Sequence, residues 1–162
     1  MTLKEDVNAA LHELGQHVKF EVPSLDDKGA SRLVIQVPPA LHALRDGELM
    51  IDIQLSSMGD RFSLLTPIAA FTNPPNRDVL EALLRRQFAG GQSSGLSYAI
   101  RTVDDQYYTL FAIAHWILGS ITPQQFQQFY QRFMAAAFMV LDDIAEIGQL
   151  TPDIEAFHPG KS

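Results

Sequence analysis

Residues 47–72 have the sequence GELMIDIQLSSMGDRFSLLTPIAAFT, and this stretch decides the fold class. Aliphatic side chains occupy every second position of its first half: Leu49, Ile51, Ile53 and Leu55. This period of two predicts a strand with one buried and one wet face. Gly59-Asp60 is a tight-turn signal, and residues 61–72 return as the next strand. The stretch therefore predicts an antiparallel hairpin.

The chain before this hairpin predicts one helix and two further strands. Thr2 followed by Glu5 has the spacing of a capping box, and the apolar stripe behind it predicts a helix over residues 3–15. Apolar runs predict strands over residues 18–22 and 32–37, each ended by proline. Residues 40–47 are expected to form an irregular connection or a short helical turn.

The chain after the hairpin predicts a helix, a second hairpin and a long final helix. Asn76 is a strong cap for a helix over residues 77–88. Aromatic and β-branched residues predict strands over 96–103 and 106–118. Thr122-Pro123-Gln124-Gln125 combines a cap, a first-turn proline and a capping-box glutamine, which predicts a helix that ends near residue 147.

The resulting order is α-β-β-β-α-β-β-α, with one extra strand candidate near the start. Strands joined by hairpins imply an antiparallel sheet with helices segregated to one face or to the ends, which is the α+β class. We expect a single domain over residues 1–150 and a loose C-terminal tail over 151–162.

Composition excludes several classes of function. The chain has 162 residues, a formal net charge of −7, 46% hydrophobic residues and no cysteine. The acidic balance argues against nucleic-acid and anionic-membrane partners, whose phosphates attract basic faces. Without cysteine there is no disulfide, thiol nucleophile or thiolate metal site. No signal peptide or membrane span is predicted, so a cytoplasmic protein is expected.

The sequence shows no pattern of catalytic, metal-binding or cofactor-binding residues. Five scattered histidines lack the three- or four-residue spacing that places two ligands on one helix face. The GGQSSG run at 90–95 follows a helix and lacks the lysine of a phosphate loop. Asp142, Asp143 and Glu146 indicate a solvated face or a docking surface for a basic partner. His115 is expected to be a core or interface histidine.

Residues 106–141 are almost uncharged, because Arg132 is their one fully charged side chain. The run FMAAAFMVL at 133–141 is apolar on every side of a helix, and the strand before it is apolar on both faces. The first helix, a second copy of the chain or a client protein must therefore cover Met134, Phe138 and their neighbours. This excess of apolar surface predicts an oligomer.

The order of elements resembles the type III secretion chaperone-like fold, and within it the YbjN-type bacterial proteins, whose function is poorly characterised. The resemblance is carried by GELMIDIQL (47–55), RFSLLTPIA (61–69), VLEALLRRQF (79–88), LSYAIRTVDDQYYTLFAIA (96–114) and the long final helix. It implies a homodimer that binds segments of a partner protein. The implied dimer contacts are Val79, Leu80, Leu83, Leu84, Phe111 and Ile113.

The partner-binding residues that we expect are Leu49, Ile51 and Ile53, which the resemblance implies, and the uncovered Met134 and Phe138. We therefore expect a non-catalytic, chaperone-like, protein-binding homodimer without a cofactor or metal. Two alternatives stay open. One is an enzyme or small-ligand binder with an unconventional site near His115 or Tyr98, and the other is an assembly subunit of a larger complex.

Overall fold

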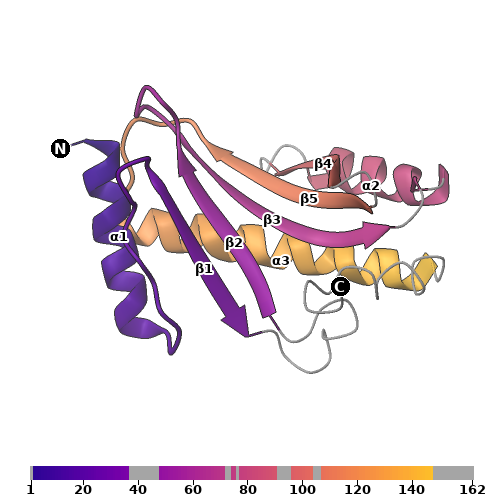
Figure 1. Cartoon of the computed structure of the whole chain (residues 1–162), viewed down its shortest axis with the longest axis horizontal. Helices are drawn as coiled ribbons and strands as arrows, with labels where there is room; N and C mark the ends of the chain where they lie inside the picture. The colour runs from indigo at the N-terminus through magenta and orange to yellow at the C-terminus, as the bar shows by residue number, and fades with distance from the viewer. Residues whose placement is uncertain are drawn as a thin grey trace.

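The computed structural model describes residues 2–36, 48–71, 74–75, 77–90, 96–103 and 107–147. Within these ranges the elements follow the predicted order. They are α1 (Leu3–His17), β1 (Ala30–Gln36), β2 (Glu48–Leu55), β3 (Phe62–Phe71), α2 (Arg77–Gly90), β4 (Leu96–Val103), β5 (Tyr107–Trp116) and α3 (Pro123–Ile147). The strands form one antiparallel sheet in the order β1-β2-β3-β5-β4 (Figure 1). The predicted α+β fold class is confirmed.

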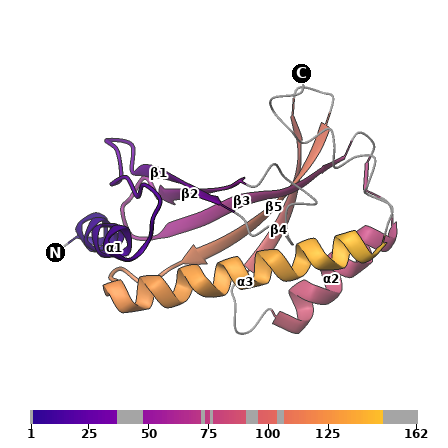
Figure 2. The ribbon, with the colours of Figure 1, turned by 90° about the horizontal axis from the view of Figure 1, so that it is seen from below.

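The helices lie on one face of the sheet. Figure 2 shows α3 running beneath the strands, with α1 at the β1 end and α2 near β4. Both α1 and α2 contact α3, and α2 also contacts β4. The core forms between this face and the helices, where the largest fully buried side chains gather: Phe62, Phe126, Leu11, Leu33, Leu49, Ile51, Ile53, Leu64, Ile68 and Leu110. Among the described residues, no helix covers the opposite face, which we call the open face.

Reciprocal caps begin two of the helices, as the sequence predicts. The Glu5 backbone N–H donates to Thr2 Oγ1 at 3.2 Å, and the Thr2 N–H donates to Glu5 Oε2 at 3.0 Å. Thr122 and Gln125 repeat the arrangement at 3.1 and 3.0 Å. Each box satisfies donors that the first helical turn leaves without intrahelical partners.

The strand predicted over residues 18–22 does not form. This segment is irregular, yet Val18, Phe20 and Val22 are partly buried against the core. The chain then closes a turn in which Asp26 takes both main-chain groups of Ala30. Its N–H donates to the Ala30 carbonyl at 2.8 Å, and its Oδ1 accepts the Ala30 N–H at 2.9 Å. The segment therefore supplies apolar side chains without supplying a strand.

Element ends differ from the prediction at a few places. Helix α1 continues through Gly15 to His17, and α2 continues to Gly90. Strand β5 ends at Trp116, so Ile117 and Leu118 lie in the following turn, where they are exposed. Gly59 has a φ of 70°, which the predicted tight turn requires. The connection over 40–47, the turn at 104–105, the Asn76 cap, residues 91–95 and the tail lie outside the described residues.

Candidate functional site

A band of apolar side chains crosses the open face of the sheet. Alternation along β3 buries Leu64 and Thr66 toward the helices and turns Leu65 and Pro67 to the open face. Cross-strand pairing aligns residues from all five strands on this face. We call this set the apolar strip: Val34, Met50, Leu65, Pro67, Ala99, Phe111 and Ile113.

The apolar strip consists of two rows that run across the strands. One row has two apolar parts, Val34 paired with Met50 on β1 and β2, and Phe111 of β5 paired with Pro67 and Ala99 on either side. The pairing of β2 with β3 ends at Asp52 and Leu65, one step before these two parts would meet. The neighbouring row has Leu65 and Ile113 at its centre, between Asp52 on one side and Ser97 on the other. Val34 is 39% exposed, and the other six side chains are partly buried.

Polar side chains border the apolar strip on both sides. On one side lie Gln54, Ser63 and His115, which are paired across neighbouring strands. On the other side, on β4 and β5, lie Arg101 and Thr109. The strip is therefore a narrow band between polar rows.

An ion pair closes the β1 end of the second row. Arg32 donates to both carboxylate oxygens of Asp52, at 2.6 and 3.2 Å. The bond to Asp52 and its negative charge raise the pKa of Arg32 further above its usual value. Both charges of this pair are satisfied within the chain.

His115 lies on this open face and not in the core, because it is two residues from Ile113 on β5 and therefore points to the same side of the sheet. It is exposed, and its Nδ1 is 2.8 Å from Ser63 Oγ. Nucleophilic use of such a serine needs a water-poor cleft and a group that orients the imidazole. No carboxylate contacts the pair within the described residues. Tyr98, the other residue considered for a ligand site, pairs with Ala112 on the helix-covered face, so the two residues do not share a site.

The predicted dimer contacts fall on two separate surfaces. Val79 and Leu83 are buried within the chain, whereas Leu80 and Leu84 are 40% and 64% exposed on the outer side of α2. Phe111 and Ile113 lie in the apolar strip, on the face of the sheet opposite the helices. The resemblance implies these six residues as one set of dimer contacts, whereas in the structure they lie on separate surfaces.

The predicted partner contacts on β2 are core residues. The alternation along β2 directs three side chains toward the helices, where they are 0–1% exposed: Leu49, Ile51 and Ile53. They offer no surface to a partner in this structure. Met134 and Phe138 of α3 are partly buried against the core, and the adjacent Met139 is 49% exposed. The chain's own helices therefore cover part, and not all, of the uncharged helix.

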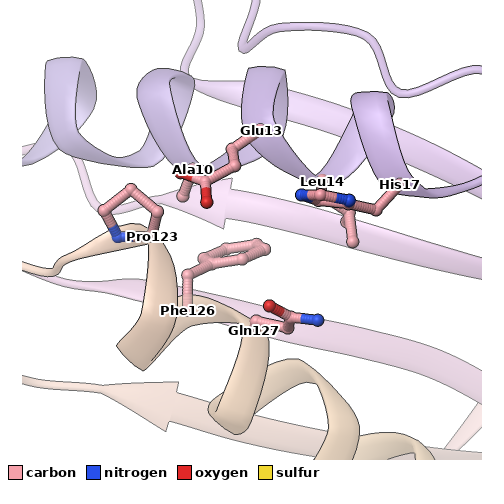
Figure 3. Close-up of a pocket in the computed structure, with 7 residues that line it drawn as sticks. All are labelled: Ala10, Glu13, Leu14, His17, Pro123, Phe126 and Gln127. Carbon is pink, nitrogen blue, oxygen red and sulfur yellow. The ribbon is translucent and has the colours of Figure 1, made fainter.

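A small hollow lies between α1 and α3 (Figure 3). It is lined by Ala10, Glu13, Leu14, His17, Pro123, Phe126 and Gln127, and its volume of about 10 Å³ has room for about one water molecule. Ligand pockets usually measure ~300–1,000 Å³. This hollow is far below the size of a metabolite site.

The described part of the chain contains neither a cluster of metal ligands nor a membrane-spanning helix. No three histidine, aspartate or glutamate side chains gather there as metal ligands would. None of the described helices combines the length and apolarity that a membrane span requires.

The arrangement of sheet and helices is the secretion chaperone-like α+β fold, with the predicted likeness to YbjN. The chain is similar to the solved structure of the ExsC-ExsE complex, with a TM-score of 0.60 and 15% identity over 88% of this chain and 96% of that chain. For the HopA1-SchA chaperone–effector complex the TM-score is 0.56, with 9% identity over 86% and 95%. For YbjN from E. coli it is 0.55, with 17% identity over 88% and 92%.

The sequence itself matches no protein-family model and no curated protein. At these low identities, the structural likeness shows the fold alone.

Proposed function

We propose that this chain is a non-catalytic, chaperone-like protein that works as a homodimer and holds a segment of a partner protein on the apolar strip. The observation that carries the proposal is the apolar strip, whose members come from all five strands on the open face. A contiguous apolar patch rimmed by polar residues is typical of a protein interaction site.

The fold supports this reading. One of the similar solved structures is a chaperone bound to an effector, and another is a two-protein complex. A sheet with all its helices on one side leaves the other side free for contact with a second protein. In this chain the side of the sheet opposite the helices carries the apolar strip.

Self-association is proposed to use the outer side of α2. Leu80 and Leu84 are four residues apart and lie next to each other on the helix surface. Arg77 Nε and Glu81 Oε1 form an ion pair at 2.8 Å on the same helix. An apolar pair framed by charges is the composition of a small symmetric contact. This leaves the apolar strip available to the partner in each copy.

The dimer is tested by light scattering on the purified chain. We expect twice the chain mass for the wild type and the single-chain mass for Leu80→Glu with Leu84→Glu. Met58→Glu, at an 83% exposed turn position, is the matched control and should remain dimeric. A wild type of single-chain mass at all concentrations would remove the homodimer from the proposal.

Partner binding is tested by photocrosslinking in the native cell. A photoreactive phenylalanine analogue replaces Phe111 in one variant and Met58 in the control. We expect a discrete adduct from position 111 only, and expect the partner, once identified and purified, to bind the wild-type chain directly. Equal adducts from both positions, or none from position 111, would contradict the proposed role of the strip.

A further inference from the structure

We infer that the segment held by the apolar strip is an amphipathic α-helix of about four turns, with an acidic residue on the flank that faces Arg101. The inference rests on the proposed function, because it specifies the partner segment for the same surface. It is drawn from the dimensions of the strip, the hydrogen bonding of the sheet and the charges at the border.

The dimensions of the strip match those of a helix. The apolar strip has members on all five strands, and four spacings of about 4.8 Å give a length of about 19 Å. At 1.5 Å per residue, about 13 helical residues span that length. The second row lies about 7 Å away, so the two rows match the apolar side of a helix about 10 Å wide.

Backbone hydrogen bonding favours a helix over an extended segment. The strip crosses the face of the sheet, and the three inner strands β2, β3 and β5 are each paired on both sides. An extended segment lying across the strip would bury its own N–H and C=O groups against apolar side chains without partners. A helix satisfies these groups internally and presents one apolar side.

The polar borders argue against a second copy of the sheet as the occupant. Face-to-face sheets pack through broad apolar faces about 10 Å apart. Here such packing would also bury Arg32, Asp52, Gln54, His115 and Arg101. Removing these groups from water is unfavourable unless each finds a partner. A helix along the strip leaves both borders in solvent.

The charges beside the apolar strip indicate which charge the partner helix carries on its flank. The chain has a net charge of −7, yet the described ionised side chains around the strip are Arg32, Asp52 and Arg101. The first two neutralise each other. Arg101 is exposed, and no described carboxylate pairs with it. An acidic side chain on the partner would meet this cation at the β4 end.

The test measures fluorescence anisotropy of labelled 14-residue peptides with the full chain. The probe is a helix, stapled on its outer side, with leucines along one side and glutamates on one flank. One control peptide has the same composition in an order that scatters the leucines, and a second carries lysine for glutamate. We expect saturable binding of the probe and at least tenfold weaker binding of the scattered peptide.

Variants of the chain give the decisive comparisons. Ile113→Thr keeps a β-branched side chain and should weaken binding of the probe about tenfold. Met58→Thr should leave the affinity for the probe unchanged. Arg101→Glu should weaken binding of the glutamate probe and strengthen binding of the control peptide that carries lysine. If the probe does not bind saturably, the inference is overturned, whatever else occupies the strip. It is also overturned if Arg101→Glu changes the affinities of the glutamate probe and the lysine peptide equally. A partner still crosslinked at position 111 would in that case leave the proposed function standing.

Discussion

Truncating two neighbouring leucines of β3 should have very different effects on stability. Leu64 is 0% exposed and faces the helices, whereas Leu65 is half-buried on the open face. Leu64→Ala and Leu65→Ala remove the same atoms from adjacent positions of one strand. The pair therefore measures how well each face of the sheet is covered in solution.

The expected magnitudes follow from burial. Leu64→Ala leaves a cavity in a closed core, and such changes lower the free energy of unfolding by about 3–5 kcal/mol. Leu65→Ala leaves no closed cavity and loses the burial of a side chain that is mostly but not fully covered, which amounts to about 1.5 kcal/mol. For a chain of this size, the midpoint temperature should fall by about 10 °C for the first variant and about 3 °C for the second.

The assay is urea unfolding followed by circular dichroism and by the fluorescence of Trp116. This tryptophan is the only one in the chain, and its ring centroid lies 6.4 Å from that of Phe62 and 5.4 Å from that of Phe129. Equal losses for the two variants at low protein concentration would refute an uncovered open face. A loss at Leu65 that grows with protein concentration would indicate that a second copy covers it.

Three further predictions concern single residues. Thr122→Ala should lower the free energy of unfolding by about 1 kcal/mol in urea, because the α3 capping box is lost, whereas Thr122→Ser should retain it; equal losses would contradict the cap. The backbone N–H of Ala30 lowers the pKa of Asp26 below 3.8, so its stabilisation is present above pH ~4 and is lost as the pH falls through the folded-state pKa. Asp26→Asn should therefore flatten the acid limb of stability against pH, and an unchanged limb would argue against this carboxylate. Burial raises the pKa of Tyr130 to about 12 from 10.0, so stability should fall as the pH rises from 10 to about 12. Tyr130→Phe should remove that fall and a component near pH 12 of a phenolate absorbance titration, and an unchanged titration would count against the burial of Tyr130.

Local signals in the sequence predict most of the fold. The capping boxes at Thr2 and Thr122 act within one helical turn, and the alternation in residues 48–55 sets which side chains share a face. Both depend on neighbours in the chain alone. Residues 18–22 show the limit of this reasoning, because apolar side chains can pack on a core without pairing as a strand. The sequence carries no signal that distinguishes the two outcomes there.

The candidate surface could not be predicted in the same way. Alternation separates Leu49, Ile51 and Ile53 from Met50, Asp52 and Gln54, but it does not say which set meets the helices. Strand β2 alone suggests a polar outer face, because two of these three outward residues are polar. The apolar strip appears only when Val34, Met50 and Phe111 are brought together from three strands. It is a property of the sheet order, which pairs β3 with β5 and places β4 at the edge.

The turn before β1 bears on how this protein avoids joining sheets with its neighbours. A sheet edge with unpaired main-chain groups is a template for strand addition and aggregation. At the start of this edge strand, Asp26 already occupies the N–H and C=O of Ala30. Gly29 holds the turn at a φ of 75°, and a side chain there would place its Cβ 2.8 Å from Leu55 Cβ. Substitution of this glycine should therefore disturb the turn and leave the N–H and C=O of Ala30 open to strand addition at this end of the edge.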